Sequence, residues 1–241
     1  MLLQEKTVAS FVTENYKSAD VFKKYNIDFC CGGNVPLNSV CTQNNINLEE
    51  IVLELEKIME NNKPSEDIDY ASWSLDKLAK HILETHHVYI KESSPTLETY
   101  LLKLRRVHGE RHPELIKVQE IFSNLSLELS NHLMKEENIL FPYILKLCSL
   151  DKGESVDNIN KLATVKNPIS CMMMEHEVAG DEIKEINALT NNYTIPEDAC
   201  NTYRVTFKKL EEFQNDLFMH VHLENNILFP KVIELEEKLF K

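Results

Sequence analysis

Two segments of the chain, residues 132–142 and 220–230, follow one pattern: His-x-x-x-Glu-x-Asn-Ile-Leu-Phe-Pro. Each segment therefore carries a histidine and a glutamate four residues apart. On a helix, residues i and i+4 lie one above the other on the same face, so each segment presents an imidazole and a carboxylate side by side. This spacing suits metal ligands. Its repetition within one frame predicts a duplicated unit that supplies half of a single site each time.

The composition and the apolar spacing both favour helices. Gly occurs 5 times and Pro 8 times in 241 residues, and both residues weaken a helix interior. After residue 72, apolar residues recur at intervals of three and four through four long segments. Before it, two helical patterns flank a Cys-Cys-Gly-Gly turn, and residues 61–67 are typical of a linker. We therefore expect an all-α chain with a small N-terminal helical domain over residues 1–62 and a four-helix bundle over residues 72–241.

The charge and the cysteines limit the partners and the compartment. The net charge of -13 argues against nucleic acid and anionic membrane surfaces, because both repel an acidic protein. No apolar stretch approaches the roughly 18 residues of a membrane span, and the N-terminus lacks the basic start and apolar run of a secretion signal. The six cysteines are scattered, apart from the adjacent Cys30 and Cys31, so we expect reduced thiols. These features predict a cytoplasmic protein.

Five polar residues fall on the apolar stripes that a bundle would bury: His132, Glu136, His176, His220 and Glu224. A lone histidine on such a stripe is usually a core residue with a hydrogen-bond partner. A buried carboxylate costs several kcal/mol when it is unpaired, so each glutamate needs either its own histidine or lysine, or a cation. Nitrogen and oxygen ligands without thiolate favour iron or manganese over structural zinc, and two carboxylates able to bridge favour a pair of metals. We expect a metal pair.

Four stretches together resemble one known family: the two His-x-x-x-Glu-x-Asn-Ile-Leu-Phe-Pro segments, Met174-Glu-His-Glu-Val-Ala-Gly180, and Lys24-Tyr-Asn-Ile-Asp-Phe-Cys-Cys-Gly-Gly33. Over essentially its whole length, the chain is similar to the iron-sulfur cluster repair (repair of iron centres) family. These are hemerythrin-like di-iron proteins with a small cysteine-bearing N-terminal domain. The resemblance implies two non-haem iron ions with oxo and carboxylate bridges. It also implies repair of clusters damaged by nitrosative or oxidative stress, by iron delivery or nitric oxide chemistry, with iron-sulfur proteins as clients.

The resemblance further implies the metal ligands, with Glu136 and Glu224 as the bridges between the irons. The matching positions are His87, His132, Glu136, His176, His220 and Glu224. One of them conflicts with the helical periodicity, which places His86 nearer than His87 to the centre of the apolar stripe. We follow the family pattern and expect His87 to be the ligand.

Two further positions bear on the expected centre. His108 is in phase with the apolar residues of its helix, and it is either a further ligand or a hydrogen-bond donor behind the ligands. Gly180 stands where oxygen-carrying hemerythrins have a second histidine four residues after His176. This difference implies a more open iron site, which suits reactivity or iron release better than oxygen storage.

The adjacent thiols of Cys30 and Cys31 have three interpretations. They are inert packing residues beside a turn, or redox- and nitrosation-sensitive thiols that form a strained disulfide, or transient ligands for iron or nitric oxide. We favour a functional role without choosing its form.

Two other functions stay open besides repair. One is a module that reversibly binds or senses oxygen or nitric oxide, and the other is a nitric oxide reductase. The chain is therefore not assigned as a conventional enzyme. Whether it forms a homodimer is also open. The cysteine-bearing module and Gly180 favour repair.

Overall fold

The computed structural model describes residues 3–60, 68–156 and 164–240. The predicted linker at residues 61–67 lies outside the described residues, as do the two ends of the predicted N-terminal domain. Across the described ranges all regular elements are helical, apart from one isolated bridge between Thr7 and Pro36. The predicted all-α class is confirmed. None of the helices in these ranges is both long enough and apolar enough to cross a membrane.

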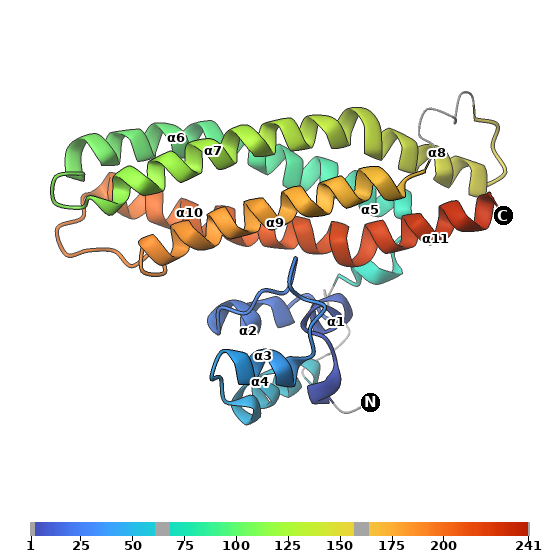
Figure 1. The fold of residues 1–241 in the computed structure, drawn as a ribbon, viewed down its shortest axis with the longest axis horizontal. Coiled ribbons are helices and arrows are strands. Elements are labelled where there is room, and N and C mark those ends of the chain that lie inside the picture. Colours follow the sequence, from blue (N-terminus) through green and yellow to red (C-terminus); the bar gives the residue numbers. More distant parts are fainter. Residues whose placement is uncertain (1–2, 61–67, 157–163, 241) are drawn as a thin grey trace.

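Four short helices form an N-terminal module, which lies beneath the middle of the molecule in Figure 1. After the 3-10 turn η1 (Leu3–Glu5), they are α1 (Val8–Glu14), α2 (Ser18–Lys24), α3 (Leu37–Gln43) and α4 (Leu48–Glu60). The Thr7 hydroxyl accepts a hydrogen bond from the Ser10 amide (3.2 Å) and caps the start of α1. Asn26, with a left-handed φ of 53°, follows the end of α2. The buried rings of Phe11 and Phe22 pack edge to face in the module's core.

Four long helices form the bundle, and shorter helices extend it. The long helices are α6 (Val88–His108), α7 (Glu114–Lys135), α9 (Lys166–Leu189) and α10 (Asn201–Leu223). The 3-10 turn η2 (Tyr70–Ser72) and α5 (Leu75–His81) precede α6, while α8 (Phe141–Asp151) follows α7 and α11 (Phe229–Leu239) follows α10. Figure 1 shows the four long helices running side by side, as the apolar spacing predicts.

A π-helical turn lies at three of the four places where the sequence predicts metal ligands. These turns are η3 (Ile82–His87), η4 (Glu136–Leu140) and η6 (Glu224–Leu228). Pro142 and Pro230 follow the last two, and proline has no amide hydrogen to continue the α-helical bonding. A π turn inserts one extra residue, so it shifts the phase of the helix, and such turns are frequent at functional sites. The fourth ligand-bearing helix, α9, has no such turn.

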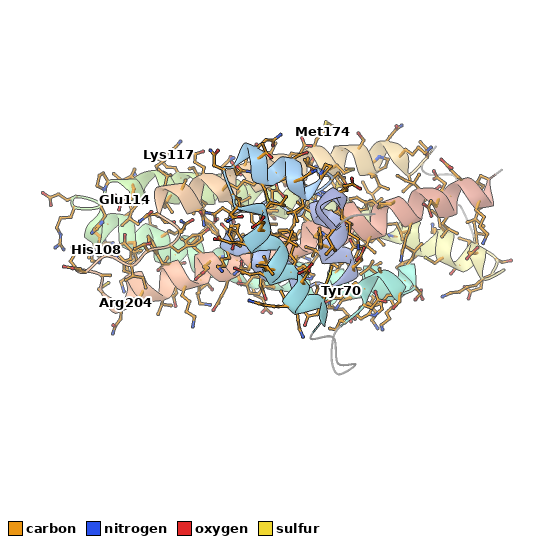
Figure 2. The ribbon with its side chains drawn as sticks, turned by 90° about the horizontal axis from the view of Figure 1, so that it is seen from below. Tyr70, His108, Glu114, Lys117, Met174 and Arg204 are labelled. Atoms are coloured by element: carbon orange, nitrogen blue, oxygen red, sulfur yellow. The ribbon has the colours of Figure 1, made fainter. Side chains whose placement is uncertain are left out.

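The loop between α2 and α3 attaches the module to the bundle, and Figure 2 shows the module lying across the middle of the bundle. Phe29 on this loop is fully buried and contacts the rings of Phe218 and His222, both on α10. Lys184 Nζ donates to Asp28 Oδ2 (2.6 Å) at the edge of this contact. Apolar residues of the module and the bundle therefore belong to one continuous core.

Candidate metal centre

Six side chains from the helices of the bundle converge in two groups that offer metal ligands. The first group is His87, Glu136, His220 and Glu224, and the second is His132, Glu136, His176 and Glu224. Within each group, one ligand atom per residue lies within 4.8 Å of the others. The structure therefore brings together the six residues that the sequence predicts, and both glutamates belong to both groups.

The π turns place the two glutamates at the centre of the bundle. Glu136 begins η4 and Glu224 begins η6, and each follows a histidine by four residues. His87 ends η3, whereas His176 lies inside the continuous helix α9. Both glutamates are completely buried and the four histidines are no more than 3% exposed, so water has little access to the ligand atoms.

Glu136 lies between one histidine of each group. Its Oε2 atom is 3.4 Å from His87 Nε2 and 3.3 Å from His132 Nε2. A single carboxylate oxygen therefore faces both halves of the centre. This is the position expected for a carboxylate that joins two cations.

Glu224 joins the other two histidines with its two oxygens. Its Oε1 atom is 3.1 Å from His220 Nε2, and its Oε2 atom is 3.2 Å from His176 Nε2. One oxygen thus faces the first group and the other faces the second. All four imidazoles present Nε2, and not Nδ1, to the glutamates.

Most of these nitrogen and oxygen atoms have no hydrogen-bond partner in the part of the chain that the structure describes, although His132 Nε2 and His176 Nε2 lie 3.0 Å apart. Among the described residues, both carboxylate oxygens of Glu136 and of Glu224, and Nε2 of His87 and of His220, have no hydrogen-bond partner. Burying two unpaired carboxylates costs several kcal/mol. A cation shared by these atoms would satisfy each of them. The residues therefore fit a pair of metal ions.

Residues behind the imidazoles hold them in this orientation. His87 Nδ1 lies 2.9 Å from Glu137 Oε1, His132 Nδ1 lies 2.8 Å from Glu175 Oε2, and His176 Nδ1 lies 2.9 Å from Asn225 Oδ1. In the described residues, His220 Nδ1 has no such partner. Such contacts fix the tautomer and turn Nε2 toward the metal. Sequence reasoning missed these three partners, although each is the immediate chain neighbour of a predicted ligand.

In the metal-free protein, protons take the place of the cations. Burial lowers the pKa of His87, but the adjacent carboxylates of Glu136 and Glu224 outweigh it and raise that pKa to about 10. Burial also lowers the pKa of His132, and the Glu136 charge outweighs it and raises that pKa to about 9. The neighbouring imidazoles hold the pKa of Glu224 well below its usual range despite its burial. Near pH 7, His87 and His132 therefore carry protons that a metal ion must displace.

Loading the metal-free protein with a divalent cation near pH 7 is expected to release about two protons per chain, one from His87 and one from His132. Because both raised pKa values lie above this pH, metal affinity should increase as the pH rises toward about 9. An indicator titration in weak buffer measures the release. His132→Gln should lower it by about one proton, whereas His112→Gln, outside both groups, should not change it. Loading without proton release would contradict the assignment.

The π turn η3 separates the roles of the two adjacent histidines. Both are buried, but His87 faces the glutamates, whereas His86 Nδ1 lies 2.9 Å from Asp216 Oδ1 and its ring stacks on that of His220. Regular α-helical periodicity predicts His86 as the inward residue. The extra residue of the π turn shifts this phase, so the structure groups His87, and not His86, with the glutamates.

His108 lies in neither metal group. It is the last residue of α6, which begins immediately after His87, and a helix of 21 residues is about 30 Å long. Its Nε2 atom is 3.2 Å from Cys200 Sγ instead. The apolar period places His108 on the correct face of its helix, but the period alone carries no information about its depth along the bundle. We therefore leave His108 out of the ligand set.

Cys30 and Cys31 are free thiols whose sulfur atoms lie 3.8 Å apart. The Cys30 amide donates to Asp28 Oδ1 (2.9 Å), and the hydrogen bond with Cys31 together with burial raises the pKa of Cys30 well above its usual value. The Cys31 thiol donates to the main-chain oxygen of His176 (3.4 Å). The cysteine pair therefore contacts the backbone of a candidate ligand, and its chemical role stays a prediction.

Gly180 leaves room for this contact. A Cβ atom at Gly180 would lie 3.6 Å from Cys31 Sγ, so a side chain larger than a methyl group would meet the loop of the module. In this fold, the position four residues after His176 is therefore covered by the N-terminal module, and a histidine ring there would displace it.

A surface cavity reaches only one half of the centre. It has a volume of about 470 Å³, and its lining includes His132 and His176 of the second group, together with Glu175 and Cys171. Neither His87 nor His220 lines it. This cavity therefore adjoins the second group of ligands.

Comparisons with known proteins agree with this geometry. Residues 78–232 match the family described as "Hemerythrin HHE cation binding domain", and residues 4–59 match "Domain of Unknown function (DUF542)". The chain is 38% identical to a Haemophilus influenzae protein named "Probable iron-sulfur cluster repair protein", covering 88% of this chain and 90% of that protein. It is 33% identical to "Iron-sulfur cluster repair protein ScdA" of Staphylococcus epidermidis, over 96% of this chain and 100% of that protein. It is 32% identical to "Iron-sulfur cluster repair protein YtfE" of Pectobacterium atrosepticum, over 98% of this chain and 100% of that protein.

Proposed function

Because this chain belongs to the iron-sulfur cluster repair family of hemerythrin-like proteins, we propose that it repairs damaged iron-sulfur clusters with a centre of two non-haem irons. One observation carries the proposal: Glu136 and Glu224 are each shared by two groups of buried ligands. Two shared carboxylates and four imidazoles, without a thiolate, form a donor set that suits iron and a carboxylate-bridged pair.

The protein's own residues prepare this centre. Glu137 and Glu175 orient the imidazoles of His87 and His132, and lysines hold both carboxylates in turn: Lys91 Nζ donates to Glu137 (2.6 Å), and Lys135 pairs with Glu175. Complete burial of the bridging glutamates excludes water. When bound, the irons would supply ferrous ions for a damaged cluster and a centre that reacts with nitric oxide or oxygen.

The clients we propose are proteins with damaged iron-sulfur clusters, and the small ligands are nitric oxide and oxygen. We place this activity in the cytoplasm, where the six free cysteines would stay reduced. The cavity beside His132 and His176 supports iron delivery, because a labile ion needs a route out of the bundle.

Transfer to a client tests the proposal. The iron-loaded protein is mixed anaerobically with an apo-ferredoxin and sulfide, while a ferrous chelator captures any free iron. Cluster absorption and the iron content of the separated proteins are then measured. We expect the cluster to form despite the chelator, and faster than with the same amount of free ferrous ion. The Glu224→Leu variant, treated in the same way, is the matched control.

Other outcomes distinguish the competing functions. Iron that stays on the protein in the presence of both client and chelator would contradict repair by delivery and favour reversible binding or sensing of oxygen or nitric oxide. Catalytic formation of nitrous oxide from nitric oxide, without cluster formation, would favour a nitric oxide reductase.

A further inference from the structure

A cysteine and a histidine meet at the end of the bundle remote from the C-terminus, where Figure 2 labels His108 and Arg204. His108 Nε2 lies 3.2 Å from Cys200 Sγ. This pair shares no residue with the metal groups, and α6 separates His108 from His87 by about 30 Å. The metal centre therefore does not account for it.

The pair combines an exposed nucleophile with a buried base. Cys200 is exposed, whereas His108 is 4% exposed and is held against the ring of Tyr203. Cys200 is also the N-cap residue of α10, a helix of 23 residues. Its side chain makes no capping hydrogen bond to this helix and contacts His108 instead. An imidazole within hydrogen-bond distance can take the thiol proton as the sulfur attacks.

Asp198, the acidic residue nearest to Cys200 in sequence, is held by two basic side chains: its Oδ2 accepts from Arg111 Nη1 (2.9 Å), and its Oδ1 lies 3.0 Å from His112 Nε2. Hydrogen bonds to Asp198 and to Glu114 raise the pKa of His112. Lys103 Nζ donates to Thr202 Oγ1 (3.3 Å), in the first turn of α10.

No other cysteine sulfur contacts Cys200 in the described chain, so an intramolecular disulfide is not available to it. We infer that Cys200 is a nucleophilic thiol, activated by His108, that forms mixed disulfides with small disulfides of the glutathione type. This inference does not depend on the proposed iron chemistry.

The reaction is a thiol–disulfide exchange. Cys200 Sγ attacks one sulfur of the small disulfide while His108 Nε2 takes the thiol proton. The new S–S bond joins Cys200 to one half of the disulfide, and the original S–S bond breaks. The leaving thiolate then takes the proton from His108. Cys200 is oxidised, and the departing half is reduced to a thiol.

Cys171 provides an internal control, because it is also an exposed free cysteine. Its sulfur lies 3.5 Å from Glu175 Oε1, and burial together with this carboxylate raises the pKa of Cys171. The iron-loaded protein is incubated with oxidised glutathione near pH 7, quenched with acid, and mapped by peptide mass spectrometry. We expect Cys200 to gain the adduct about a hundredfold faster than Cys171, the lower end of general-base assistance.

Two variants test whether His108 is the base that activates Cys200. His108→Gln should bring the Cys200 rate close to that of Cys171, whereas His112→Gln, which removes the neighbouring imidazole, should leave it high. An unchanged Cys200 rate in folded His108→Gln would overturn the role of His108. If that variant does not fold, the wild-type comparison decides: a Cys200 rate equal to or below that of Cys171 overturns the inference. Iron content and the circular dichroism spectrum verify that each variant is folded.

Discussion

Replacing Glu224 with Leu is expected to reduce the iron bound per chain from about two to less than one. Glu224 contributes one oxygen to each group of ligands, so its loss removes a donor from both irons at once. Glu136→Leu should act in the same way, because Glu136 Oε2 faces a histidine of each group. Quantification of iron in purified protein, together with the near-ultraviolet absorption of an oxo-bridged pair, measures the effect.

The same change should destabilise the metal-free protein, because it removes one partner from a buried cluster of charges. Both glutamates are completely buried, and removing one partner of a buried ion pair costs about 3–5 kcal/mol. Circular dichroism of each metal-free variant therefore accompanies the iron measurement and separates iron loss from misfolding. Glu177→Leu, an exposed position beside His176, is the matched control and should keep full iron. Full iron in Glu136→Leu and Glu224→Leu would refute the ligand assignment.

Replacing Phe29 with Ala is expected to lower the free energy of unfolding by about 3–5 kcal/mol, the usual cost of truncating a buried aromatic side chain. Phe29 is fully buried and its ring contacts those of Phe218 and His222. It lies in the loop that attaches the module to the bundle. The variant should therefore weaken that attachment as well as the core.

Chemical denaturation followed by circular dichroism measures this loss. Phe240→Ala removes the same side chain where it is 57% exposed, so that control should change stability by less than about 0.5 kcal/mol. We also expect the Cys31 thiol of Phe29→Ala to react faster with iodoacetamide, because it would no longer be held on the main chain of His176. Wild-type stability in Phe29→Ala would show that the loop does not contribute to the core.

Several features could be predicted from the sequence because they depend on local spacing. The all-α class follows from apolar residues at intervals of three and four, which also predict the four long helices. The four-residue spacing of His132 with Glu136 places both on one helix face. The family resemblance, confirmed by the relatives, selected His87 over His86, against the regular period. His87 faces the centre because η3 is a π turn, and its extra residue shifts the phase that a regular α-helical period predicts.

Other features required contacts between segments distant in the chain. Cys31 reaches the main chain of His176 across 145 positions, and Gly180 leaves space for that contact. His108 has the phase of a ligand, but its position at the end of a 21-residue helix removes it from the centre and places it beside Cys200. Neither contact leaves a periodic signal, since both depend on how far along the bundle each residue lies.

By itself, the sequence determined the helices, the two His-x-x-x-Glu pairs and the donor chemistry, because a helix sets the relation between residues four apart without help from the rest of the chain. Only the tertiary structure showed that Glu137, Glu175 and Asn225 orient three of the histidines, and that a surface cavity adjoins His132 and His176. These relations join different helices. They depend on the packing of the bundle, on its π turns and on the module docked against it.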